Sequence, residues 1–265
     1  MESVRHHGRA TAYREADDSR ADVAGSDQTV CYVHGSGATH RVWAGQYGAG
    51  GPTGAAVALD LSGHGESDDV ETGPGTPTLD AYARDVVAVA RETDATVLAG
   101  SSLGGAVALW VTLETDFDPE GLVLAGTGAR LPVAADLREW LRDDFDRAVE
   151  FLHGPDRLFH DADERVVERS KAQLRATGRA VTERDFLTCH RFDVRDRLDA
   201  VGAPAIAVVG EYDGLTPPSY HESLAAELRD CEYAEVPDAA HLAMAERPRA
   251  FGDAVAAFVR ERVPR

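Results

Sequence analysis

The stretch from Ala95 to Trp110 places the strongest constraint on how this chain folds. Residues 95–99 form an apolar run with the length of a buried strand, and residues 105–110 begin an apolar helix. Between them lies Gly100-Ser101-Ser102-Leu103-Gly104, which has the pattern G-x-S-x-G. In this context the pattern is typical of a nucleophile elbow, a sharp turn that holds a serine hydroxyl clear of the backbone. Ser102 is therefore a candidate nucleophile.

The pentapeptide alone also fits a closely packed turn that does no chemistry, so partner residues must decide its role. A serine nucleophile needs a base that takes its proton and an acid that orients the base. Of the ten histidines, only His241 lies just after the last expected strand, and Asp213 lies just after the strand before it. We therefore predict a catalytic triad of Ser102, Asp213 and His241.

Apolar runs alternate with helical patterns along the chain, which favours βαβ units and a mostly parallel sheet. Runs of this kind predict strands at 29–33, 55–59, 95–99, 121–125, 205–209 and 232–236. An antiparallel hairpin is expected before them, around residues 10–15. Apolar residues at helical spacing predict helices at 79–87 and 248–262.

The segment 127–195 interrupts this alternation, because it contains helical patterns and no good strand. One helix is predicted from Leu137 to Leu152, a second around Val166 to Leu174, and a third with Thr182 as its N-cap. We therefore divide the chain into an α/β core, 1–126 and 196–265, and a helical cap, 127–195.

Insertions at the carboxyl edge of a sheet commonly cover a binding site, because the connecting segments there carry the functional residues. On the third predicted helix of the cap, Phe186, Cys189 and Phe192 recur at helical spacing. These residues are candidates for the substrate pocket. Packing of the cap against the core explains them equally well.

A loop after the first buried-type strand supplies the remaining requirement, a site for the oxyanion. His34-Gly35-Ser36-Gly37 follows the strand at 29–33, where a loop amide should face the elbow. We predict that the backbone N–H groups of Ser36 and Leu103 are the donors. Each such donor contributes about 3 kcal/mol to transition-state stabilisation, and Leu103 also lies at a helix N-terminus, whose dipole favours negative charge. His34 is expected to brace this loop.

Five segments, in the order in which they occur, resemble the α/β-hydrolase superfamily. They are the loop 34–37, residues 60–67 (Asp-Leu-Ser-Gly-His-Gly-Glu-Ser), the elbow, residues 210–213 and His241. The resemblance is closest to small capped carboxylesterase-like members. It implies an eight-stranded, mostly parallel sheet whose second strand is antiparallel, helices on both faces, and a helical cap. It also implies hydrolysis of a small-molecule ester through an acyl-enzyme intermediate, with no metal and no organic cofactor.

Other functions remain compatible with these residues, because a fold does not fix a reaction. The same triad serves lyases, C–C bond hydrolases, thioesterases and amidases. A ligand-binding receptor that reuses the pocket is the alternative without catalysis.

The composition limits which partners the protein can bind and in which compartment we expect it. Asp and Glu number 46 against 27 Lys and Arg, a net charge of −19, and such a surface repels nucleic-acid phosphates. The N-terminus lacks the apolar segment of a signal peptide, and no apolar run could span a bilayer, so we expect a cytoplasmic protein without a membrane partner. Cys31, Cys189 and Cys231 are widely spaced and suggest neither disulfides nor zinc. The sequence leaves the oligomeric state open, with a homodimer among the options.

Lys171 is the only lysine, and the charge balance as a whole indicates a protein from a high-salt cytoplasm, with an ordinary acidic protein as the alternative. Repulsion among the acidic residues should destabilise the folded state at low ionic strength. In molar salt the Debye length falls to about 3 Å, which screens this repulsion. We expect the midpoint of thermal unfolding to rise from a dilute buffer to molar KCl. Equal midpoints in scanning calorimetry would contradict salt adaptation.

Overall fold

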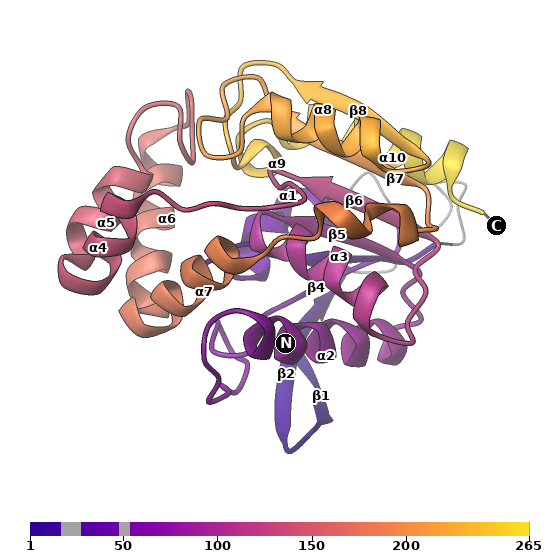
Figure 1. Ribbon diagram of the computed structural model, residues 1–265, viewed down its shortest axis with the longest axis horizontal. Coiled ribbons are helices and arrows are strands. Elements are labelled where there is room, and N and C mark those ends of the chain that lie inside the picture. Colours follow the sequence, from indigo (N-terminus) through magenta and orange to yellow (C-terminus); the bar gives the residue numbers. More distant parts are fainter. Residues whose placement is uncertain (17–27, 48–53, 265) are drawn as a thin grey trace.

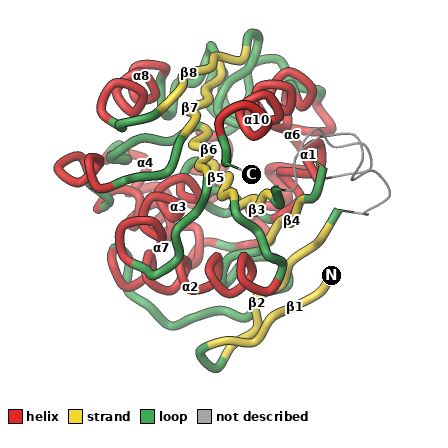
Figure 2. Tube along the Cα trace, turned by 90° about the vertical axis from the view of Figure 1, so that its right-hand side faces the viewer, coloured by secondary structure: helices red, strands yellow, loops and turns green. Residues whose placement is uncertain are grey.

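The computed structural model describes residues 1–16, 28–47 and 54–264, and its strands form an eight-stranded sheet (Figures 1 and 2). The strand order is β1-β2-β4-β3-β5-β6-β7-β8. The strands are β1 (Glu2–His6), β2 (Arg9–Glu15), β3 (Val30–Val33), β4 (Ala56–Leu59), β5 (Val97–Ser101), β6 (Gly121–Ala125), β7 (Ala205–Gly210) and β8 (Cys231–Val236). β2 runs antiparallel to both of its neighbours, and every other pair is parallel. The predicted fold class is confirmed.

The six apolar runs predicted as strands all form strands, displaced by no more than two residues at either end. Their side chains alternate between the two faces of the sheet, as the pleat requires. On β3, for example, Cys31 and Val33 belong to one buried cluster, and Val30 and Tyr32 belong to another. In the five strands other than β8, both faces are apolar because helices cover both. β8 lies at the edge of the sheet and exposes Tyr233 and Glu235.

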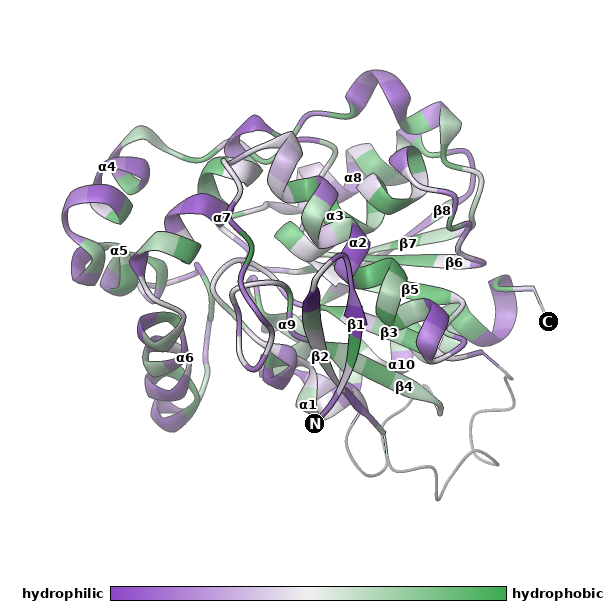
Figure 3. Cartoon of the chain, turned by 90° about the horizontal axis from the view of Figure 1, so that it is seen from below, coloured by the Kyte–Doolittle hydropathy of each residue, from purple (hydrophilic) through white to green (hydrophobic). Residues whose placement is uncertain are grey.

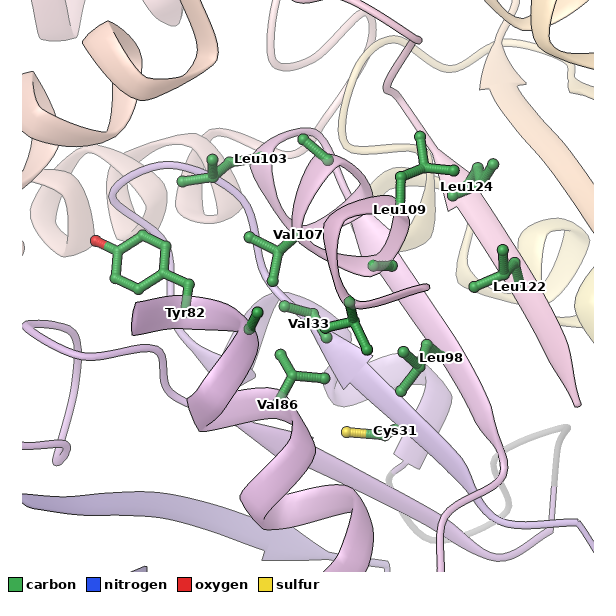
Figure 4. Close-up of a cluster of buried hydrophobic side chains, with 14 of the residues drawn as sticks. Cys31, Val33, Tyr82, Val86, Leu98, Leu103, Val107, Leu109, Leu122 and Leu124 are labelled. Carbon is green, nitrogen blue, oxygen red and sulfur yellow. The ribbon is translucent and has the colours of Figure 1, made fainter. Parts of the chain in front are cut away.

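One face of the sheet is covered by α2 (Thr76–Glu92), α3 (Leu103–Glu114) and α8 (Pro218–Glu227) (Figure 2). The other is covered by η1 (His40–Trp43), α1 (Ala44–Tyr47), α9 (Ala243–Glu246) and α10 (Pro248–Arg262). Figure 4 shows the first cluster, in which Val86 of α2 and Val107 of α3 lie over Val33 and Leu98 of the sheet. These contacts fix α3, and therefore the elbow at its start, against the central strands.

Four helices lie between β6 and β7, and Figure 1 shows α4, α5 and α6 gathered at the end of the molecule away from the C-terminus. They are α4 (Ala135–Asp143), α5 (Phe145–Leu152), α6 (Glu164–Thr177) and α7 (Arg179–Arg191), and η2 (Arg195–Ala200) follows them. Hydrophilic residues cover much of α4 and α6, whereas the central strands are mainly hydrophobic (Figure 3). A separate small core, which includes Leu141, Val149 and Leu174, holds α4, α5 and α6 together.

Two predictions about these helices are wrong in detail. The single helix expected from Leu137 to Leu152 breaks at Asp144, whose backbone leaves the helical region and whose carboxylate accepts the Arg147 amide at 3.2 Å. Asp144 therefore caps a new helix, and the apolar spacing continues across the break. Thr182 is not an N-cap, because α7 begins at Arg179 and Thr182 lies buried within it.

Among the described residues, no helix is both long enough and apolar enough to cross a membrane.

Candidate active site

Ser102 lies at the turn between β5, which ends at Ser101, and α3, which begins at Leu103. Its backbone has φ 55° and ψ −117°, a left-handed conformation that is costly for a residue with a side chain. Two hydrogen bonds to the end of β6 and the residues after it hold Ser102 in this conformation. The Ser102 amide donates to the carbonyl of Ala125, and the Thr127 hydroxyl donates to the carbonyl of Ser102, each at 2.9 Å. The strained turn exposes the serine side chain partly to solvent.

The two glycines of the pentapeptide permit this turn to pack against its neighbours. A Cβ atom on Gly100 would lie 2.2 Å from the carbonyl oxygen of Gly104, and one on Gly104 would lie 2.2 Å from the carbonyl oxygen of Val33. Both distances are far below van der Waals contact, so only glycine fits at either position. The G-x-S-x-G pattern therefore reflects close backbone approach among β3, β5 and α3.

His241 and Asp213 form a hydrogen-bonded pair at the ends of β8 and β7. The Nδ1 atom of His241 lies 2.8 Å from Oδ2 of Asp213. Asp213 also accepts the amides of Leu215 and Thr216, at 2.9 and 2.8 Å, and the Thr216 hydroxyl at 2.8 Å. With the carboxylate as acceptor, Nδ1 of His241 carries a proton, and in the neutral ring Nε2 is left as the basic nitrogen.

Burial opposes the ionisation of Asp213, but the charge and hydrogen bond of His241 and the bonds from Thr216 outweigh it. The pKa of Asp213 is therefore held below its ordinary value. An ionised Asp213 stabilises the imidazolium that forms when His241 takes up a proton.

A cavity of about 1090 Å³ contains both Ser102 and His241 in its wall. The imidazole of His241 also lies against Gly126, the residue that follows β6, where a Cβ atom would meet its Cε1 and Nδ1 at 3.2 Å. Within the described residues, no hydrogen bond joins the Ser102 hydroxyl to His241. The structure thus brings the three predicted triad residues to one edge of the sheet, with the acid and base bonded and the serine in the same cavity wall.

The loop after β3 approaches the elbow. Gly35 and Ser36 line the cavity, and a Cβ atom on Gly35 would lie 3.0 Å from Cβ of Ser102. In the part of the chain that the structure describes, the amides of Ser36 and Leu103 donate to no protein acceptor. Both amides are therefore free to donate to a bound group, as the predicted oxyanion site requires.

His34 holds this loop in place. Its Nε2 accepts the Leu61 amide at 3.0 Å, so its Nδ1 donates to the carbonyl of Gly35 at 2.8 Å. Burial, and secondarily the charge of His64, lowers the pKa of His34 to about 4. His34 is therefore neutral near neutral pH and fixed in one tautomer.

Two of the three predicted pocket residues, Phe186 and Cys189, line the cavity, and Phe192 does not. Phe186 and Cys189 lie three residues apart on one face of α7, whereas the helix ends at Arg191 and Phe192 continues in extended backbone. Phe192 is buried in the core instead. Burial raises the pKa of Cys189 to about 12, so this thiol is protonated and is no rival nucleophile.

Sequence reasoning missed a buried polar cluster centred on Asp185 of α7. Its carboxylate bonds to Nε2 of His64 at 2.9 Å, to the Tyr82 hydroxyl at 2.6 Å and to the Gly37 amide at 3.1 Å. Burial opposes both charges, but their mutual attraction and hydrogen bond raise the pKa of His64 and lower that of Asp185. This cluster joins the helical segment to the loop that carries Ser36.

Backbone bonds join the segment after α5 to the loops of the acid and the base. The amide of Gly214 donates to the carbonyl of Asp156 at 2.9 Å, and the amide of His241 donates to the carbonyl of Arg157 at 3.1 Å. The carboxylate of Glu246 accepts the amides of His160 and Ala240, each at 2.9 Å. Each loop that carries a predicted triad partner is thus bonded to the segment between β6 and β7.

Within the described residues, no group of three or more His, Cys, Asp or Glu side chains is placed to hold a metal ion.

The chain matches the α/β hydrolase family over residues 32–254 and belongs to that family. It is an esterase-like member. It is 28% identical over 260 residues to a pimeloyl-[acyl-carrier protein] methyl ester esterase of Neisseria meningitidis serogroup C, across 91% of this chain and 96% of that protein. It is 23% identical over 247 residues to 3-oxoadipate enol-lactonase 1 of Acinetobacter baylyi, across 87% of this chain and 88% of that protein. The solved structure of a thermophilic esterase superposes with a TM-score of 0.84 at 28% identity, covering 98% of this chain and 97% of that one.

Removal of the Asp185 charge should change how stability depends on pH. His64, with its raised pKa, contributes stability that is complete below about pH 6.5 and is lost as pH rises through its folded-state pKa. Asp185, with its lowered pKa, contributes stability that is lost only as pH falls through that pKa. We expect Asp185→Asn to lower the unfolding free energy by about 3–5 kcal/mol at pH 6, with a smaller loss at pH 9.

Urea unfolding followed by tryptophan fluorescence measures both values. The control is Asp69→Asn, which removes the exposed partner of Arg184, the neighbour of Asp185. It should cost less than about 1 kcal/mol at either pH. An Asp185→Asn loss as small as the control's, or one that does not change with pH, would show that the buried pair is not ionised.

Proposed function

We propose that this chain is a serine hydrolase that cleaves carboxylic esters through an acyl-enzyme intermediate, with Ser102 as nucleophile, His241 as general base and Asp213 as its orienting acid. The 2.8 Å bond between His241 and Asp213, at the wall of the cavity that contains the strained Ser102, carries the proposal. Membership of the α/β hydrolase family and similarity to a methyl ester esterase and an enol-lactonase support ester hydrolysis.

In the proposed reaction, His241 carries each proton between the nucleophile, the leaving group and water. Nε2 of His241 takes the Ser102 proton as Oγ attacks the ester carbonyl carbon, and the amides of Ser36 and Leu103 donate to the oxyanion. The imidazolium, stabilised by Asp213, then protonates the leaving alkoxide, and the alcohol departs from the acyl-serine. A water molecule, deprotonated by the same nitrogen, attacks the acyl carbon, and the acid is released with Ser102 reprotonated.

In this proposal residues 127–195 act as a cap that shapes the substrate cavity. Phe186 and Leu137 of this segment line the cavity together with Ser102 and His241 of the core, which supports the assignment. A protein of this kind would bind a small-molecule ester and need neither metal nor cofactor.

Thioesters, amides and β-diketones are the substrates of the alternative reactions that this fold supports. A ligand-binding receptor would hydrolyse none of them. A substrate panel across these classes tests the reaction type. Rapid stoichiometric labelling of Ser102 by a fluorophosphonate would favour an enzyme over a receptor.

We expect Ser102→Ala to lower kcat for 4-nitrophenyl acetate by about 10⁴-fold or more, because removal of the nucleophile leaves only binding and the oxyanion donors. Release of 4-nitrophenolate measures the rate. The matched control is Ser101→Ala at the adjacent position, whose hydroxyl is buried and lacks a hydrogen-bond partner. It should retain most of the activity. A Ser102→Ala variant with near-normal turnover would rule out this nucleophile.

A further inference from the structure

The charged residues of the cavity wall have the opposite sign from those of the molecule as a whole. Acidic residues outnumber basic ones by 46 to 27 across the sequence. Among the described residues that line the cavity, none is Asp or Glu, whereas Arg41, Arg157 and Arg169 all line it. The charged side chains that line the cavity of this acidic protein are therefore all basic in the described part of the chain.

These three arginines also lack acidic partners. Within the described parts of the chain, no carboxylate lies within ion-pair distance of any of them. The contrast is clearest on α6, where Lys171 and Arg175 pair with Glu150 at 2.7 and 3.1 Å, while Arg169 points to the cavity wall unpaired. Among the described residues, therefore, no ion pair neutralises their positive charge.

Arg157 is held in a fixed position beside the base. Its carbonyl accepts the amide of His241, its Nη1 donates to the carbonyl of Phe151 at 2.6 Å, and its guanidinium carbon lies 3.6 Å from the centre of the Phe151 ring. It is partly buried, whereas Arg41 and Arg169 are exposed to solvent. A guanidinium fixed in this way retains N–H donors that suit a carboxylate or a phosphate.

From this arrangement we infer that the ester taken by this site carries an anionic group, a carboxylate or a phosphate, at a distance from its scissile carbonyl. The inference rests on the proposed function and names its substrate class. Unpaired positive charges within apolar walls attract an anion and raise its local concentration, whereas a neutral ester gains nothing from them. Hydrophobic lining residues such as Leu137 and Phe186 then contact the apolar part of the substrate.

The test compares esters of matched length. We expect kcat/KM for mono-4-nitrophenyl adipate, which has a free carboxylate, to exceed that for 4-nitrophenyl hexanoate by about tenfold or more, mainly through a lower KM. 2-Acetoxyethyl phosphate places the anion on the alcohol side instead, and its neutral counterpart with a similar alkoxide leaving group is pentyl acetate; titration of the released acid follows both. Whichever anionic ester exceeds its own neutral counterpart identifies the side on which the anion binds.

Variants test whether the three arginines cause the preference for anionic esters. The double variant Arg41→Gln/Arg169→Gln alters exposed side chains and should lower the anionic-to-neutral ratio by about fivefold or more. Arg157→Gln should lower it further, and Arg157→Lys, which keeps the charge, should restore part of it. The control, Arg165→Gln, lies one turn before Arg169 on α6, is exposed and does not line the cavity, so the ratio should not change.

Two results would overturn the inference, and a third would overturn the assignment of the anion to the arginines. If Ser102-dependent hydrolysis of each neutral ester equals or exceeds that of its anionic counterpart, the substrate class is wrong while the proposed function stands. A chain that hydrolyses none of these esters refutes the proposed function, and the inference with it. An anionic preference that survives in the double variant and in Arg157→Gln would show that other groups bind the anion.

Discussion

Close backbone contact between β3, β5 and the start of α3 is the constraint on which the rest of the site depends. Carbonyl oxygens of Val33 and Gly104 occupy the space that side chains at positions 104 and 100 would need. This contact holds the turn at Ser102 in its strained conformation and brings the loop after β3 beside it. The apolar residues of α2 and α3 that pack on the sheet stabilise a geometry that the turn would not adopt alone.

The helical segment between β6 and β7 is bonded to all three loops around the cavity. Asp185 accepts the amide of Gly37, and the carbonyls of Asp156 and Arg157 accept amides beside Asp213 and at His241. The segment that lines the cavity is therefore joined to the loops of all three proposed triad partners and oxyanion donors outside the elbow. A substitution in this segment can alter the position of His241 without contacting it.

Local patterns in the sequence predicted the strands, the elbow and the positions of Ser102, Asp213 and His241, because each residue follows the carboxyl end of a strand. The same reasoning failed where a residue's surroundings come from distant segments. His64 and Asp185 are 121 positions apart, and nothing near either one in the sequence indicates their contact. Thr216 could have been found, since an aspartate in a turn commonly accepts amides two and three residues later.

The break at Asp144 and the burial of Phe192 show a second limit. Apolar spacing continued through both positions, but a capping carboxylate ended one helix and the end of α7 turned the chain away from the cavity. Periodicity reports which residues are buried and does not report where a helix ends or which neighbour buries them.

The single lysine has a practical consequence. Lys171 lies on α6 between Ser170 and Ala172, which both line the cavity, and its ammonium is paired with Glu150 and Glu168. Apart from the chain terminus, a reagent selective for primary amines has this one target. A fluorophore or tether attached there would lie beside the cavity wall, and no other side chain of this sequence would compete for the reagent.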